Sequence, residues 1–494
     1  MKVHKKLSDL LFRYLLFLFT IVTVIAVIMI GVYMFQSGGP SIAKVGIKNF
    51  LFGKTWDTSV EPAKYGILPF LLSSVFSMIG TVVITVPVSI LVAVGMSHFI
   101  PRPVASVLRT VISMLAGIPS VIYGFLGMIL LVPFVQNMFS LPAGLTLLSA
   151  IVVLIVMTLP TIISVSESSI TAVPEEYMEA SLALGVNREY TILHIIVPAA
   201  KSGILSAVLL GLGRAVGETM AVIMVAGNVA QMPKLLEPVR FLTTAIVTEM
   251  AYASEETSGV LMDSYGIKPM LINTIYTVVL TLIFCIPLGI GSAIYLAEYA
   301  KQGKIVSGIR FAIEILAGIP SIVYGLFGLN FFVRKMAIGD YAGSMLSASL
   351  TLTLIVLPTM IRTTEESLLA VSQTYREAAI ATGMSKFYMI RKIILPCAIS
   401  GIVVAIILSI GRMVSESAAL LYTAGIAQDL PSSVMSHVTE PGATMTVQLY
   451  LYATEGGAPE WVPYAMAAVL MVFVLFIEIL THVIAAVFKK RRKG

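Results

Sequence analysis

Ten apolar runs, each about 20 residues or longer, constrain this chain more than any other feature of its sequence. They cover 13–35, 67–97, 109–132, 144–165, 199–226, 271–297, 310–333, 342–361, 397–425 and 463–488. A run of this length spans a bilayer as an α-helix, because a helix satisfies its own backbone hydrogen bonds in lipid. Only 12% of the 494 residues are charged, which leaves too little polar surface to cover a water-soluble globule. We therefore predict an all-α polytopic membrane protein with about ten transmembrane helices, and we exclude a soluble enzyme.

The positions of Lys and Arg predict how the chain is oriented in the bilayer. Cytoplasmic loops of membrane proteins carry an excess of these residues. Both ends of the chain are basic, with Lys2, Lys5 and Lys6 at the start and a basic run at 489–493. An even number of spans places both ends on one side, so we predict a multi-pass protein of the cell membrane with both termini cytoplasmic. The net charge of +6 follows from these segments and does not indicate nucleic-acid binding.

Motifs in the first part of the chain recur about 200 residues later. Ala-Gly-Ile-Pro-Ser at 116–120 recurs at 317–321, and Leu-Pro-Thr at 159–161 recurs at 357–359. Four predicted spans separate equivalent segments, so both repeats have the same orientation. Two parallel repeats suggest a pseudo-two-fold axis along the membrane normal, with a path between the halves. We expect the proline of each Gly-Ile-Pro-Ser motif to bend its span, either as a fixed kink or as a hinge.

A repeated segment also precedes each of the spans 199–226 and 397–425. Each segment reads as a short amphipathic helix, a glycine, and a second short helix. The Glu-Ala pair and the glycine of the two segments are Glu179, Ala180 and Gly185, and Glu377, Ala378 and Gly383. The glycine allows a sharp turn because it accepts a positive φ. Such helices either dock into a groove on a partner or lie on the inner leaflet, and their repetition favours docking.

Two pairs of charges lie inside predicted spans. Arg214 and Glu218 are four residues apart, and Arg412 and Glu416 repeat this spacing. In a continuous helix each pair would share one face. Charges at mid-membrane are costly and mark water-accessible routes, and a guanidinium binds an oxyanion with two parallel hydrogen bonds. The pairs therefore predict an oxyanion path, although they are also compatible with ion pairs that hold helices together.

The two glutamates allow a hypothesis about selectivity. Phosphate near neutral pH keeps a proton that it can donate to a carboxylate, whereas sulfate has none. A carboxylate beside each arginine, from Glu218 and Glu416, would therefore discriminate against sulfate.

The sequence offers no motif for a cofactor, a metal or catalysis. The cysteines Cys285 and Cys397 lie in or beside apolar runs, and the histidines show no ligand spacing. Gly53-Lys54-Thr55 lacks the glycine of a phosphate-binding loop, since position 48 is Lys48. We predict a transporter rather than an enzyme, without a bound cofactor. ATP-driven transport would then require a separate ATPase subunit.

Several of these motifs resemble the permeases of phosphate-specific ABC importers. Gly213 to Ala221 is similar to the PstC permease, whereas 293–299 and 420–425 are similar to its PstA partner. The chain therefore resembles a fusion of a PstC-like half at 1–262 with a PstA-like half at 263–494. The resemblance implies the MetI-like fold of type I ABC importer permeases, with two parallel repeats. Family members usually have six spans each, so two spans at the fusion point are expected to be missing.

The resemblance also implies partners and roles. A cytoplasmic ATPase dimer would grip the two Glu-Ala segments, and an extracytoplasmic phosphate-binding protein would deliver inorganic phosphate. The residues expected to line the phosphate path are Arg214, Glu218, Arg412, Glu416 and Arg362. The second half departs from the family at Ser415, where the family has glycine.

Two alternatives remain open at this point. The chain could be an ABC permease for another oxyanion, such as sulfate, molybdate or tungstate. It could also be a secondary anion carrier, whose uptake would depend on an ion gradient rather than on an ATPase.

Overall fold

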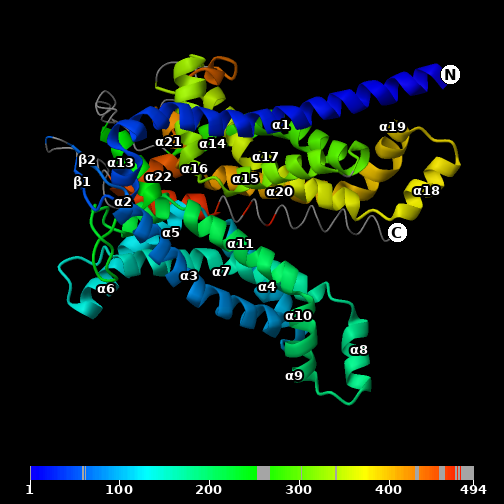
Figure 1. Ribbon diagram of the computed structural model, residues 1–494, viewed down its shortest axis with the longest axis horizontal. Helices are drawn as coiled ribbons and strands as arrows, with labels where there is room; N and C mark the ends of the chain where they lie inside the picture. The colour runs from blue at the N-terminus through cyan, green and yellow to red at the C-terminus, as the bar shows by residue number, and fades with distance from the viewer. Residues whose placement is uncertain are drawn as a thin grey trace. The chain divides into compact units, whose positions relative to one another are not determined.

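The computed structural model describes residues 2–57, 61, 63–252, 267–301, 303–339, 342–428, 433–454, 462–472, 476 and 479. The chain forms two compact units. The first unit contains the first copy of the repeated motifs and comprises Ile42–Gly259. The second unit contains the second copy and comprises Met1–Ser41 together with Val260–Gly494. Apart from β1 (Trp56–Asp57) and β2 (Lys64–Tyr65), which pair antiparallel, the regular elements of the described residues are helices (Figure 1). The prediction of an all-α fold is confirmed.

Within the described residues, seven helices are long and apolar enough to cross a membrane, and nine if each bent pair counts as one span. They correspond in order to the first nine predicted runs. The seven are Asp9–Val45, Leu68–Phe99, Ser120–Phe139, Leu147–Thr171, Lys268–Tyr299, Met345–Leu369 and Lys386–Ser415. The bent pairs are Arg188–Ala199 with Lys201–Gly217, and Lys304–Gly318 with Ser321–Lys335. The tenth predicted run, 463–488, lies mostly outside the described residues, which include its first part as the apolar helix Val462–Val472.

Three long helices form the centre of the first unit. These are α3 (Leu68–Val94), α7 (Leu147–Thr171) and α11 (Lys201–Gly217). Every fourth residue of α3 from position 73 to 89 is a small buried hydroxyl residue: Ser73, Ser77, Thr81, Thr85 and Ser89. A stripe of small residues lets helix backbones approach closely in lipid, where burial of large apolar side chains gives little driving force. On α11, Gly203 lies so close to Ser169 of α7 that a side chain at this position would overlap it.

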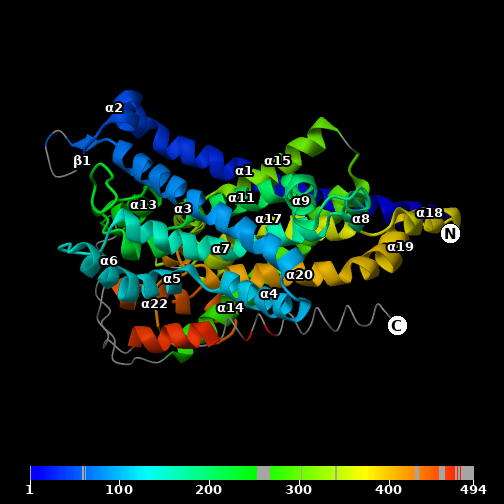
Figure 2. The same ribbon diagram turned by 90° about the horizontal axis from the view of Figure 1, so that it is seen from below.

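The second unit repeats this arrangement with α14 (Lys268–Ile294), α17 (Met345–Leu369) and α20 (Leu395–Ser415). Gly401 of α20 lies against Ser367 of α17, as Gly203 lies against Ser169. The internal repeat read from the motifs is therefore a repeat of structure. The units differ where their last long helix begins. Arg188–Ala199 meets α11 at a bend of 68°, whereas Lys386–Ser415 is one continuous span that includes both α19 (Lys386–Met389) and α20 (Figure 2).

The remaining helices connect these cores. In the first unit they are α2 (Ile47–Phe52), η1 (Gly95–Phe99), α4 (Arg102–Gly117), α5 (Ser120–Leu126), η2 (Gly127–Leu131), α6 (Val132–Phe139), α8 (Glu175–Ala183), α9 (Arg188–Thr191), η3 (Ile192–Ile196), α10 (Val197–Ala199), α12 (Met220–Val225) and α13 (Leu242–Tyr252). In the second unit they are η4 (Tyr295–Tyr299), α15 (Lys304–Gly318), α16 (Ser321–Gly328), η5 (Leu329–Lys335), α18 (Gln373–Ala381), η6 (Ile390–Ile394), α21 (Leu420–Thr423), η7 (Ser436–Val438) and α22 (Met445–Thr454). The elements η1 to η6 are π-helical, and they occur as matched pairs in the two units.

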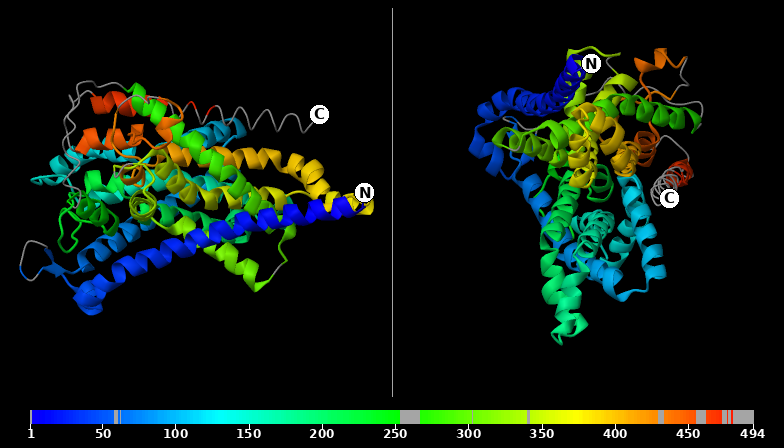
Figure 3. Two further views of the ribbon diagram at one scale, coloured as in Figure 1. Left: turned by 90° about the horizontal axis from the view of Figure 1, so that it is seen from above. Right: turned by 90° about the vertical axis from the view of Figure 1, so that its right-hand side faces the viewer.

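The first helix of the chain, α1 (Lys2–Val45), packs with the second repeat (Figure 3). The Phe17 ring lies 5.2 Å from the Tyr295 ring, and the Tyr33 ring lies 5.9 Å from the Phe327 ring. Gly291 leaves room for Phe19, because any side chain there would overlap its ring. The compact units therefore differ from the sequence halves 1–262 and 263–494 chiefly in residues 1–41. The repeated motifs do not include α1, so the internal repeat does not predict that α1 packs with the second unit.

Candidate functional site

The guanidinium of Arg214 is held near the end of α11 by groups of other helices. Its Nη1 donates to the Thr161 hydroxyl at 3.0 Å, and Ala116 O of α4 lies at 3.5 Å from the same nitrogen. Thr161 follows Pro160 inside α7. The Arg214 side chain is half-buried. The arginine therefore joins three elements of the first unit while part of its surface stays accessible.

Glu218 does not share a helix face with Arg214, so the predicted geometry is wrong. The helix α11 ends at Gly217, and Glu218 is extended, with φ −70° and ψ 132°. Its carboxylate accepts the backbone N–H of Ala221 at 3.0 Å and so satisfies a free donor at the start of α12. Its carbonyl accepts the hydroxyl of Thr243, at the start of α13, at 3.0 Å. Glu218 thus organises the chain where the long helix breaks.

The second unit reproduces both arrangements. Arg412 Nη1 donates to the Thr359 hydroxyl at 3.2 Å, and the Glu416 carboxylate accepts the N–H of Ala419 at 3.2 Å. Glu416 also accepts the Thr446 hydroxyl at its carbonyl, at 2.7 Å. The helix α20 ends at Ser415, so the pair Arg412 and Glu416 does not share a helix face either.

The departure at Ser415 has a simple structural consequence. Ser415 is the last residue of α20, and its hydroxyl donates to the carbonyl of Gly411 at 2.6 Å. This bond to the preceding turn keeps the serine within the helix. The break therefore occurs at Glu416 without the glycine that the first unit has at Gly217.

The Gly-Ile-Pro-Ser motifs are helix breaks and not kinks within continuous spans. In the first unit α4 ends at Gly117, Pro119 is extended, and α5 starts at Ser120. The equivalent helices of the second unit meet at a bend of 95°. The tyrosine that follows each motif ties the break together: Tyr123 donates to Leu115 O and Tyr324 to Leu316 O, both at 2.7 Å. Each hydroxyl adds a second, shorter bond to a carbonyl that also accepts the N–H of Ile118 or Ile319 at 3.3 Å.

The glycine after each tyrosine leaves room for the short helix that follows Glu218 or Glu416. A Cβ added to Gly124 would lie 2.7 Å from Ala221 Cα, and one added to Gly325 would lie 2.8 Å from Ala419 Cα. These alanines are the residues whose N–H groups bond to Glu218 and Glu416. The repeated motif therefore positions the same part of the site in both units.

Arg362 lies one turn beyond Thr359 along α17. Its Nη2 is 3.9 Å from Glu314 Oε1 of α15, and the two side chains are 45% and 56% exposed. Ion pairs of this exposure contribute little to stability. The first unit has Ser164 at the equivalent place, so this pair belongs to the second repeat alone.

The segments with Glu-Ala pairs have the predicted helix–glycine–helix form. Gly185 has φ +81° and Gly383 has φ +73°, and short helices flank both (Figure 1). The side chains of Asn187 and Ser385 cap the second helix of each segment. All six predicted coupling residues are exposed: Glu179, Ala180, Gly185, Glu377, Ala378 and Gly383. Each segment therefore leaves its Glu-Ala pair exposed on the surface of its unit.

Ion pairs link helices within each unit, and they were not predicted from the sequence. Arg109 of α4 pairs with Glu167 of α7, and Arg310 of α15 pairs with Glu365 of α17 at 2.7 Å. These pairs occupy equivalent positions, so comparison of the repeats contained the signal. A third pair is found in the second unit, where Arg376 of α18 lies 2.8 Å from the buried Glu298.

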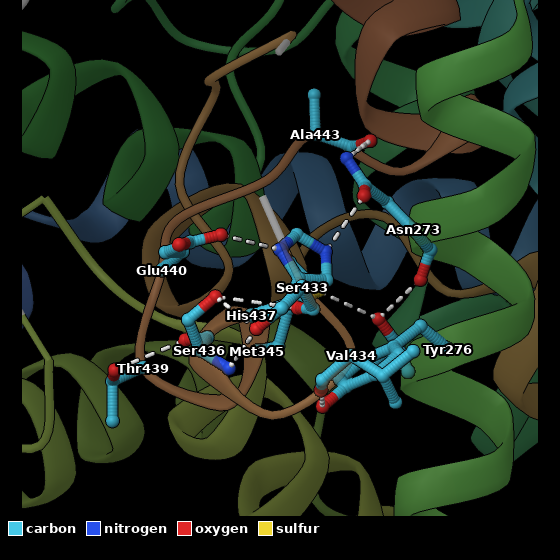
Figure 4. Close-up of polar contacts among 11 residues, drawn as sticks. Asn273, Tyr276, Met345, Ser433, Val434, Ser436, His437, Thr439, Glu440 and Ala443 are labelled. Atoms are coloured by element: carbon cyan, nitrogen blue, oxygen red, sulfur yellow. Dashed lines mark hydrogen bonds and ion pairs between the residues drawn. The ribbon is translucent and has the colours of Figure 1, made fainter. Parts of the chain in front are cut away.

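A buried histidine organises the loop that follows α21 (Figure 4). His437 is 2% exposed, with Nδ1 3.1 Å from Glu440 Oε2 and Nε2 2.9 Å from Asn273 Oδ1. Asn273 of α14 donates its amide to Ala443 O at 3.1 Å. The first unit has the exposed pair Lys234–Glu237 at the equivalent position. Among the described residues, no group of three His, Cys, Asp or Glu side chains could hold a metal ion.

Comparison with known proteins identifies the family. The sequence model of the family "Binding-protein-dependent transport system inner membrane component" matches this chain twice, at residues 85–287 and 285–494. The probable ABC transporter permease protein YqgH of Bacillus subtilis is 35% identical over 254 residues, which cover 51% of this chain and 82% of that protein. A PstA homolog of the phosphate transport system of Mycoplasma pneumoniae is 26% identical over a match that covers 84% of this chain and 85% of that protein. The phosphate transport system permease protein PstC of Xylella fastidiosa is 30% identical, covering 52% and 84%. The chain therefore belongs to the family of binding-protein-dependent transport system inner membrane components, which are membrane permease subunits of ABC transporters and not enzymes.

Proposed function

We propose that this chain is the permease subunit of an ATP-driven importer of inorganic phosphate. The observation that carries the proposal is the arginine–threonine pair, Arg214 with Thr161 and Arg412 with Thr359, built twice in a family whose relatives include phosphate permeases. A guanidinium matches the geometry of a phosphate oxyanion and stays charged at any physiological pH. Residues 1–262 correspond in this proposal to PstC and residues 263–494 to PstA.

The half-burial of Arg214 and Arg412 supports a role for both in phosphate passage. Arg362 joins the path in the second unit. Glu218 and Glu416 have two tasks in this proposal: each carboxylate caps the following short helix, and each accepts the proton of a hydrogen phosphate ion. A carboxylate has two oxygens with several acceptor positions, so the two tasks are compatible.

The coupling segments support the proposed partners. Leu184, next to Gly185, and Ile380, three residues before Gly383, are 84% and 66% exposed, which suits helices that dock into a groove. A cytoplasmic ATPase dimer grips both segments and hydrolyses ATP outside this chain. An extracytoplasmic phosphate-binding protein docks on the opposite face, and both termini of the chain are cytoplasmic.

Uptake of radiolabelled phosphate by proteoliposomes that contain this chain, its ATPase and its binding protein tests the proposal. Arg214→Ala and Arg412→Ala should each lower uptake at least tenfold, and ATP removal should abolish it. Arg102→Ala, at an exposed position at the start of α4, is the control and should leave uptake unchanged. Uptake that needs an ion gradient instead of ATP would identify a secondary carrier. Stronger uptake of sulfate or molybdate than of phosphate would assign another oxyanion.

The glutamates can be tested separately because glutamine keeps the capping oxygen. In Glu218→Gln and Glu416→Gln the amide oxygen can still accept the N–H of Ala221 or Ala419, whereas the negative charge is lost. Sulfate should then compete with phosphate for uptake. Retained phosphate uptake with no gain in sulfate competition would contradict the proton-acceptor role.

A further inference from the structure

The two arginines are held by threonines in the same way in both units. In each case the guanidinium donates through Nη1 to a threonine hydroxyl 53 residues earlier in the chain, at 3.0 Å for Arg214 and 3.2 Å for Arg412. The threonines end the repeated Leu-Pro-Thr motifs of α7 and α17. Two units with different neighbouring residues have thus kept the same side-chain contact.

Other threonines of these helices make a different contact. Thr158 of α7 donates to Leu154 O of its own helix, and Thr353 of α17 donates to Ser349 O, both at 2.7 Å. This bond to the preceding turn is the usual one for a threonine within a helix. At Thr161 and Thr359 the hydroxyl oxygen faces another helix and accepts from the arginine.

A hydroxyl has a particular advantage as an anchor for a cation that binds an anion. Elsewhere in the units, the guanidinium groups of Arg310 and Arg376 donate to the carboxylates of Glu365 and Glu298. A carboxylate anchor brings a negative charge that competes with a bound oxyanion. A threonine orients Nη1, and with it the guanidinium plane, without adding charge.

We infer that Thr161 and Thr359 are positioning residues that orient Arg214 and Arg412 for a tetrahedral oxyanion. The inference rests on the proposed function. A free arginine side chain samples many rotamers, and fixing one of its nitrogens before the anion arrives removes part of that entropic cost from binding. The threonines act through the arginines and are not themselves required to contact the anion.

The test compares variants of the full chain, assembled with its ATPase and binding protein in proteoliposomes. In Thr161→Val and Thr359→Val the shape is kept and the hydroxyl is lost. Each should lower the initial rate of phosphate uptake about tenfold, as expected for one hydrogen bond to a charged group. The phosphate moved per ATP hydrolysed should fall by a similar factor, while the thermal midpoint of the assembled complex stays within about 2 °C. Thr161→Ser and Thr359→Ser keep the hydroxyl and should restore at least half of the uptake.

Thr158→Val is the matched control, because it removes a buried hydroxyl of the same helix that bonds within that helix. It should leave uptake per ATP unchanged. Normal uptake in both valine variants would overturn the inference, as would an equal loss in the control or a failure of both serine variants. If the threonine variants are normal while Arg214→Ala and Arg412→Ala abolish uptake, only the inference fails. If the arginine variants also transport normally, the proposed phosphate path fails as well.

Discussion

Asp9 and Phe387 are joined by a hydrogen bond although 378 residues separate them in the chain: the Phe387 backbone N–H donates to Asp9 Oδ1 at 2.6 Å. Phe387 lies in the first turn of α19, the second short helix of the Glu-Ala segment around Gly383. The Phe12 ring of α1 meets the Phe387 ring edge-to-face at 4.7 Å. The beginning of the chain thus supports the Glu-Ala segment of the second unit.

Removal of the Asp9 carboxylate should loosen this Glu-Ala segment. In Asp9→Ala the N–H of Phe387 loses its acceptor, and loss of such a cap costs about 0.5–2 kcal/mol. Hydrogen exchange of residues 386–391 should become about 2- to 30-fold faster, by the same free energy. The Glu-Ala segment of the first unit is an internal control, because the side chain of Asn187 caps α9 there, whereas Asp9 bonds to Phe387 of the second unit. Equal acceleration in both segments would contradict a local role for Asp9.

The ion pair of Glu298 with Arg376 should be the strongest contributor to stability among the second unit's ion pairs. The two side chains are 3% and 12% exposed, and Arg376 also donates to Leu368 O at 2.7 Å. Glu298→Ala leaves a buried guanidinium without its carboxylate, which costs about 3–5 kcal/mol. The thermal midpoint in detergent should fall clearly.

Glu314→Ala is the comparison for that measurement, since it removes the exposed partner of Arg362. Loss of an exposed pair costs about 0–1 kcal/mol, so the midpoint should barely change. Similar losses in the two variants would show that burial does not set the contribution of these pairs.

Alanine at the glycine of either Tyr-Gly pair should displace the short helix after the glutamate. A Cβ at Gly124 or Gly325 would meet backbone atoms at 2.7 or 2.8 Å, and backbone cannot move aside as a flexible side chain can. We expect Gly124→Ala and Gly325→Ala to destabilise the protein by about 1–3 kcal/mol and to lower uptake. In the control Gly308→Ala, within α15, no atom lies within 4 Å of the new Cβ. This control should be neutral or stabilise by up to about 1 kcal/mol, and destabilisation there would question the steric argument.

The tyrosine hydroxyls should stabilise the helix breaks. Tyr324→Phe removes the hydroxyl that donates to Leu316 O from a side chain that is 0% exposed, and leaves that carbonyl only the longer bond from Ile319 N–H. Loss of one such hydrogen bond costs about 0.5–1.5 kcal/mol, measurable as a lower thermal midpoint in detergent. Tyr14→Phe, at a residue 61% exposed, should leave the midpoint unchanged. A Tyr324→Phe protein as stable as the original would exclude this role.

The sequence predicted the parts of the site whose signal is local or repeated. The helix–glycine–helix form around Gly185 and Gly383 follows from the backbone freedom of glycine. The structure has a turn with positive φ at both glycines. Arg214 and Arg412 stand out because charges inside apolar runs are costly. The partners of these arginines were not predicted, although the repeated Leu-Pro-Thr motif contained Thr161 and Thr359, because a sequence does not state which helix faces which.

The amino-acid sequence by itself determined the membrane-spanning class, the order of the spans and the two parallel repeats, because apolar run length and motif recurrence are properties of the linear chain. The tertiary structure decided that α1 packs with the second repeat, that the helices end before Glu218 and Glu416, and that threonines hold the arginines. Each of these depends on contacts between segments far apart in sequence. Helix propensity alone would continue α11 and α20 through the glutamates, whereas bonds from the Thr243 and Thr446 hydroxyls to the glutamate carbonyls accompany the breaks.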